Sequence, residues 1–172
     1  MATKVITFSL IEGCDEFISW KKLRREYVRT LGHSLLVCSE NEIIRIFDNW
    51  ELQIHDLIKI DKANNYYTAL LIISLLHYFN RSYDQMKAYI PFITKMLENK
   101  SRKMICAATQ TLRYLVKEQP DNYDFLRNLI ANDATKWLTS ATMRYSALKL
   151  LLAAGKFLLP TIFEVTSNSF QI

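Results

Sequence analysis

The 172-residue sequence is poor in the residues that interrupt regular structure, with only three glycines and three prolines. Hairpins, tight turns and the glycine-rich loops that hold phosphate groups depend on these two residue types. The shortage disfavours an all-β fold, a collagen and a nucleotide-binding loop. The sequence also lacks an apolar stretch near the ~18 residues that a membrane helix requires, so no membrane span is expected.

Cysteine is also scarce and unevenly placed. Cys14, Cys38 and Cys106 are odd in number and widely spaced, which predicts buried thiols and neither a disulfide framework nor a zinc site. The apolar run at 5–11 is not followed by a signal-peptide cleavage site, so we expect a cytoplasmic protein. Half of the residues are hydrophobic and 12% are aromatic, which predicts a single folded domain over 1–172.

Apolar residues recur at intervals of three and four through most of the chain after residue 13, which predicts an all-α fold. Gly32 is placed where a first helix would end, and Ser39 followed by Glu42 has the spacing of a capping box that opens the next one. Asp61 precedes another apolar segment. The expected helices are 15–31, a long segment after Ser39, the segment from Asp61 to Asn80, 83–98, 101–118, 123–138, 140–154 and a last segment at 156–172.

The helical pattern repeats when the sequence is shifted against itself by 39 residues. The shift superposes small residues that let paired helices approach closely, together with larger apolar ones: Ala69, Ala108 and Ala147, then Ile73, Leu112 and Leu151. This repeat predicts a right-handed α-solenoid of antiparallel helix pairs. Its expected parts are an N-terminal helix region at 1–38, units at 39–80, 81–119 and 120–155, and the first helix of an incomplete unit at 156–172.

The repeat resembles the HEAT repeat in its second unit. That stretch carries an apolar helix with an early Pro91, and then Met104, Ala107, Ala108, Leu112 and Leu115 in the HEAT pattern. The sequence departs from the pattern at the turn, where Asn99 stands near the usual aspartate. Tyr66 and Ile105 occupy positions where arginine is usual, and only Arg144 matches.

A narrower resemblance covers about residues 17 to 172. Four stretches, in shared order, resemble the extreme N-terminal HEAT region of TOR, the target-of-rapamycin kinases of the phosphatidylinositol-3-kinase-related family: 47–49, 136–138, 143–147 and 159–163. The resemblance implies a scaffold that contributes to kinase complex assembly in nutrient and growth signalling. It further implies contacts with an adaptor subunit and a small GTPase, with endomembrane association through such partners. Kinase and rapamycin-binding residues lie outside this region of the family.

Positive charge is the main candidate functional signal, with a formal net charge of +5 and a pI near 9.1. The basic residues form one group on the first expected helix and another at a turn: Lys21, Lys22, Arg24, Arg25 and Arg29, then Lys100, Arg102 and Lys103. They are either a solvated face or a strip for an acidic partner. Nucleic-acid binding is disfavoured because the net charge is modest and no aromatic residues interleave with them in a way that makes a stacking platform.

No catalytic, cofactor or metal site is predicted. His33, His55 and His77 lack further ligands at metal spacing and are interpreted as surface or half-buried side chains. Kinase motifs are absent. The sequence predicts a protein-interaction scaffold, with a HEAT adaptor of a transport or phosphatase family as the alternative and a nucleic-acid-binding repeat third. The apolar final segment with Phe163, Phe170 and Ile172 leads us to expect a longer solenoid and self-association of the isolated chain.

Overall fold

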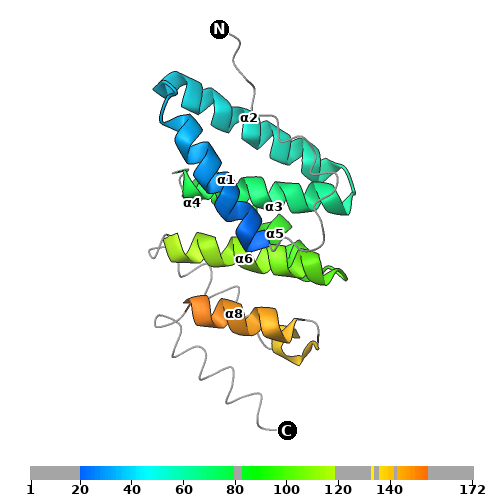
Figure 1. Ribbon diagram of the computed structural model, residues 1–172. Helices are drawn as coiled ribbons and strands as arrows, with labels where there is room; N and C mark the ends of the chain where they lie inside the picture. Colours follow the sequence, from blue (N-terminus) through cyan, green and yellow to red (C-terminus); the bar gives the residue numbers. More distant parts are fainter. Residues whose placement is uncertain (1–19, 80–82, 119–132, 134–135, 142, 155–172) are drawn as a thin grey trace. The chain divides into compact units, whose positions relative to one another are not determined.

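The computed structural model is mostly helical (Figure 1). It describes residues 20–79, 83–118, 133, 136–141 and 143–154. These residues contain no strand, which confirms the all-α prediction. The solenoid, its handedness and its division into units stay predictions. The chain separates into two compact units, Met1–Ser82 and Tyr83–Ile172, and each is described by itself.

The first unit contains three described helices: α1 (Trp20–Leu35), α2 (Glu40–Lys59) and α3 (Ala63–Tyr78). Helix α3 packs against both α1 and α2. Every residue from Tyr67 to His77 is buried. The sequence of α3 has no Asp, Glu, Lys or Arg, and a helix that is apolar on all sides is stable only where it is covered on all sides. Helix α3 is therefore the centre of this unit.

Helix α2 shows the opposite distribution of apolar residues. It buries one stripe, formed by Phe47, Trp50 and Ile54, and exposes its charged residues except Glu51, which is half-buried. The ring centroids of Phe47 and Trp50 lie 5.6 Å apart, and the ring of Phe47 stacks on Phe79 beyond the end of α3 at 6.5 Å. These three rings bury apolar area between α2 and α3, and offset aromatic contacts at such distances add to that stabilisation.

The prediction that the first helix ends at Gly32 is wrong, because α1 continues to Leu35. Leu31 and Leu35 are both buried, so the apolar stripe of α1 extends past the glycine. Glycine inside a helix costs only about 1 kcal/mol relative to alanine, less than the burial of one leucine contributes. A short connection of residues 36–38 then leads to α2.

The capping box predicted from Ser39 and Glu42 is confirmed. The Glu42 backbone N–H donates to Ser39 Oγ at 3.4 Å, while the Ser39 backbone N–H and hydroxyl both donate to Glu42 Oε2 at 2.8 Å. Both bonds from Ser39 lower the pKa of Glu42, because they favour the carboxylate. The bond from the Ser39 backbone has the larger effect and the bond from its hydroxyl the smaller one. The start of α2 is thus determined by two residues that are three apart in the sequence, the N-cap Ser39 and Glu42 in the first turn.

The expected helix after Asp61 corresponds to α3. Tyr66 Oη donates a hydrogen bond to Asp61 Oδ1 at 3.0 Å across the first turn of this helix. This bond raises the pKa of Tyr66, because the protonated phenol is the form that can donate to the carboxylate. Lys62, at the N-cap position, provides no side-chain cap.

The second unit is built around α6. Its described helices are α4 (Tyr83–Lys87), α5 (Ile90–Leu97), α6 (Arg102–Glu118) and α8 (Arg144–Ala154). Helix α6 packs against α5 on one side and α8 on the other. The expected helix at 101–118 matches α6. Those expected at 123–138 and 156–172 lie wholly or mostly outside the described residues, although 136–139 are helical.

The single helix expected at 83–98 is wrong, because a turn at 88–89 separates α4 from α5. Pro91 lies in the first turn of α5 and has no N–H to donate to the carbonyl four residues earlier. The Tyr89 N–H instead bonds the Met86 carbonyl at 2.9 Å, a tighter turn than the α-helix. The helix expected at 140–154 also begins later, at Arg144, whose N–H bonds the Ser140 carbonyl at 2.9 Å.

Candidate functional site

The basic group predicted on the first helix is mostly exposed. Lys21, Lys22, Arg25 and Arg29 all present their side chains to solvent on α1. Arg25 lies 3.8 Å from Glu26, and both side chains are more than half exposed, so this ion pair contributes little to stability. These four residues form a solvent-facing basic surface on one helix of the first unit.

Arg24 does not belong to that surface, and its prediction as part of an exposed strip is wrong. It is only 5% exposed, its Nη2 donates to the Ser74 carbonyl oxygen at 3.2 Å, and its guanidinium carbon lies 5.4 Å from the centre of the Tyr78 ring. Arg24 lies four residues after the buried Trp20 and seven before the buried Leu31, which is the spacing of one helix face. It therefore faces α3 as part of the interior.

The second basic group lies in the second unit, at the start of α6. Lys100, Arg102 and Lys103 are exposed. Lys100 and Arg102 line a cavity of about 300 Å³ together with Cys106 and Tyr145. The residues of the predicted patch are thus divided between the two units, with four exposed members in the first and three in the second.

The small residues predicted to pack paired helices are buried in three helices. Ala69 of α3 and Ala108 of α6 have no exposed area, and Ala147 of α8 is 1% exposed. The larger residues superposed with them, Ile73 and Leu112, are also fully buried. The side chain of Leu151 lies outside the described part of the structure.

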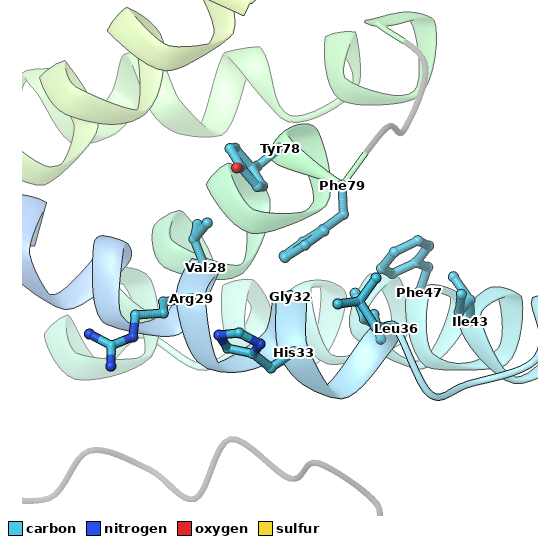
Figure 2. Close-up of a pocket in the computed structure, with 10 residues that line it drawn as sticks. Val28, Arg29, Gly32, His33, Leu36, Ile43, Phe47, Tyr78 and Phe79 are labelled. Atoms are coloured by element: carbon cyan, nitrogen blue, oxygen red, sulfur yellow. The ribbon is translucent and has the colours of Figure 1, made fainter.

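The first unit contains an apolar hollow that the sequence did not predict. It has a volume of about 610 Å³ and lies between the second half of α1, the first turns of α2 and the end of α3. Figure 2 shows Tyr78 and Phe79 at the end of α3, with Arg29 and His33 on α1 and Leu36 just after it. The full lining is Val28, Arg29, Gly32, His33, Leu35, Leu36, Ile43, Phe47, Tyr78 and Phe79. We call this site the α1–α3 hollow.

The connection beside the hollow exposes aliphatic side chains to an unusual degree. Leu36 is 82% exposed and Val37 is 86% exposed, and Tyr78 at the hollow is 48% exposed. The sequence contained one signal for this site, because three aliphatic residues, at 35–37, stand in the segment between the predicted end of one helix and the capping box of the next. Phe79 could not have been placed there without the packing of α3 on α1.

The histidines and cysteines do not converge on a reactive site in the described residues. His33 lies at the hollow and His55 is exposed, whereas His77 is 4% exposed, so its prediction as a surface or half-buried side chain is wrong. Cys38 and Cys106 are half-buried free thiols, and Cys14 lies outside the described part. No three His, Cys, Asp or Glu side chains are grouped to hold a metal ion within the described ranges.

The search for a membrane-spanning helix in the described part of the chain finds none of sufficient length and apolarity. The chain was also compared with protein-family models, with curated proteins and with solved structures, and none of the three comparisons gives a match.

Proposed function

We propose that the chain is a protein-binding helical module that acts as a scaffold. The α1–α3 hollow carries this proposal, because it joins an apolar concavity to aliphatic side chains that are more than 80% exposed at Leu36 and Val37. Exposed apolar patches of this kind mark interaction surfaces in folded proteins.

The finer form of the proposal is a right-handed HEAT-like solenoid that resembles the N-terminal region of a TOR kinase. Its support is the sequence resemblance and the all-helical fold. On this basis the chain contributes to kinase complex assembly in nutrient and growth signalling, and its partners are an adaptor subunit, a small GTPase and the rest of a longer solenoid. A HEAT adaptor of a transport or phosphatase family is the alternative. It shares the scaffold function and differs in the partners.

The test is to measure the native assembly of the chain in its own cells. An epitope tag is added at the endogenous locus, and gradient sedimentation of the lysate is followed by cross-linking and mass spectrometry. We expect the chain to sediment in an assembly larger than its own polypeptide, with a stoichiometric protein partner, and to be insensitive to nuclease. Sedimentation as a lone polypeptide would contradict a scaffold function, and collapse of the assembly on nuclease treatment would favour the nucleic-acid-binding alternative.

The same measurement separates the finer alternatives. A WD40-containing adaptor cross-linked to the chain, together with a kinase domain on the same polypeptide, is the result expected for the TOR-like proposal. Nuclear-transport cargo or phosphatase subunits in place of these proteins would support the alternative HEAT adaptor and remove the TOR-like proposal.

A further inference from the structure

The size and the lining of the α1–α3 hollow restrict what it can hold. Its volume of about 610 Å³ falls within the usual range of roughly 300–1,000 Å³ for ligand sites. Most of its lining is aliphatic or aromatic, with the buried Leu35 and Phe47 among these residues, and none of it is acidic. The hollow therefore accepts an apolar group, such as one or more side chains of a bound peptide.

The only ionic side chain in the described lining of the hollow is the cation Arg29, which is exposed on α1. His33 also lines the hollow and is exposed on the same helix. These two residues continue a row with a spacing of four residues that begins at Lys21 and passes through Arg25, and all four side chains are exposed. We call these four residues the basic row. Residues four apart lie on one side of a helix, so the row extends about 18 Å along α1, at about 1.5 Å per residue.

We propose that the α1–α3 hollow binds an acidic amphipathic peptide segment of a partner protein. Apolar side chains of the segment enter the hollow, and its carboxylates lie along the basic row. The proposal rests on the proposed scaffold function and adds the chemistry of the partner. Charge complementarity selects the occupant, because a carboxylate-bearing segment is attracted by the three cations of the basic row, Lys21, Arg25 and Arg29, whereas a basic segment is repelled.

The side chains of the site favour a peptide over a nucleic acid, a membrane or a second copy of the chain. Bases stack on aromatic faces, but one half-exposed ring, Tyr78, stands at the hollow, and the side chains most exposed beside it are the aliphatic Leu36 and Val37. A lipid surface binds the broad apolar face of an amphipathic helix, whereas the exposed face of α1 beside the hollow carries the three cations of the basic row. In a symmetric dimer that is formed through this site, the basic row of one copy would face the basic row of the other, and the two rows would repel each other.

The experiment is a selection of random peptides on the full-length chain. A phage-displayed library of about 12 residues is suitable, because a helix of that length matches the span of the basic row at about 1.5 Å per residue. Enriched peptides are synthesised with a fluorophore, and their dissociation constants are measured by fluorescence anisotropy at two salt concentrations. Circular dichroism melts establish that each protein variant is folded.

Two pairs of variants test the site. Arg29→Glu reverses a charge of the basic row, and its control Lys59→Glu makes the same change at the far end of α2. Leu36→Asp places a charge at the hollow, and its control Leu52→Asp does so at a residue that is 66% exposed on α2 and does not line the hollow. We expect the two site variants to weaken binding by roughly tenfold or more. The controls should stay within about twofold of the unmodified chain.

The outcomes distinguish this proposal from the scaffold function on which it rests. Enrichment of peptides with apolar residues and an excess of Asp and Glu, bound more weakly at high salt, is the expected result. Neutral or basic peptides, or peptides that bind both site variants normally, would overturn the hollow as the acidic-peptide site while leaving a scaffold function intact. Three other outcomes would also overturn the acidic-peptide site. One is that no peptide is enriched, and another is that the chain forms a concentration-dependent dimer that Leu36→Asp dissociates. The third is that single-stranded DNA binds more tightly than every peptide. The scaffold function itself falls only if the chain sediments alone in cells.

Discussion

Replacement of Arg24 tests the packing of α1 on α3. In the folded chain its guanidinium donates to the Ser74 carbonyl at 3.2 Å, lies 5.4 Å from the centre of the Tyr78 ring, and is 5% exposed. The Arg24→Ala variant removes the hydrogen bond, the ring contact and the packing of the aliphatic stem together. Arg25→Ala is the matched control, because its side chain is 72% exposed one position along the same helix.

The expected loss of stability can be estimated from these contacts. A hydrogen bond from a charged donor contributes about 1.5–3 kcal/mol, and a partly desolvated cation–π contact about 0.5–2 kcal/mol. The cost of removing the guanidinium from water offsets part of this sum. We therefore expect Arg24→Ala to lower the free energy of unfolding by about 2–4 kcal/mol. Arg24→Met, which retains the stem and removes the charge, should lose about 1–2 kcal/mol, and Arg25→Ala less than about 0.5 kcal/mol.

Urea denaturation followed by tryptophan fluorescence measures these differences. In a Trp137→Phe background the remaining indoles are those of Trp20 and Trp50, both buried in the first unit, so the signal reports on that unit. A fall in the midpoint with an unchanged slope gives the change in stability. If Arg24→Ala unfolds at the same urea concentration as Arg25→Ala, the interior position of Arg24 and its contacts with α3 are wrong.

Three further predictions concern local packing and titration. Ala108→Phe should lower the free energy of unfolding by about 1–3 kcal/mol through overpacking, because Ala108 is fully buried in α6; Lys103→Phe on the exposed side of the same helix is the control for the added ring in urea denaturation. Ser39→Ala should cost about 1 kcal/mol by removing the cap of α2. Because the capping bonds lower the pKa of Glu42, their contribution to the free energy of unfolding is complete at neutral pH and is lost as the pH falls through that lowered pKa. The urea midpoints of the unmodified chain and of Glu42→Gln should therefore differ at neutral pH and become equal in acid. The bond to Asp61 raises the pKa of Tyr66, so its contribution to stability is present below the ordinary tyrosine pKa and is lost as the pH rises through the raised value. The ultraviolet titration should lose one phenol with a raised pKa in Tyr66→Phe, and loss of a phenol with an ordinary pKa would contradict the bond.

Local signals in the sequence predicted the local features of the fold. The capping box of Ser39 and Glu42 involves residues three apart, so its geometry depends on nothing distant. The buried stripe of Phe47, Trp50 and Ile54 follows directly from helical spacing. Features of this kind are readable because one element contains all the residues that determine them.

The wrong predictions concern residues whose position depends on a second element. Arg24 was assigned to the surface by its charge, although it shares the spacing of Trp20 and Leu31, because only α3 supplies the carbonyl and the ring that satisfy a buried guanidinium. Gly32 favours a helix end, but the burial of Leu35 carries the helix past it. Periodicity alone predicts one helix at 83–98, whereas Pro91 lies in the first turn of a new helix, and the periodicity does not record the turn before it.

The sequence predicted one part of the candidate site, the basic surface on α1, and did not predict the other part, the α1–α3 hollow. The exposed members of the basic surface on α1 followed from helical spacing. The α1–α3 hollow did not, because its lining comes from three helices, including Phe79 at the end of α3 and Ile43 at the start of α2. A concavity between helices depends on their crossing, which no periodicity within one helix records.

The all-round burial of α3 determines where the first unit can open. Solvent deuterium reaches a helical amide only when its hydrogen bond breaks, and from Tyr67 to His77 no side of α3 faces solvent. Exchange at these amides therefore requires the flanking helices to separate, and its free energy should approach that of complete unfolding of the unit. Any local opening of this unit that spares these amides must then be confined to residues outside 67–77, such as the connection at residues 36–38.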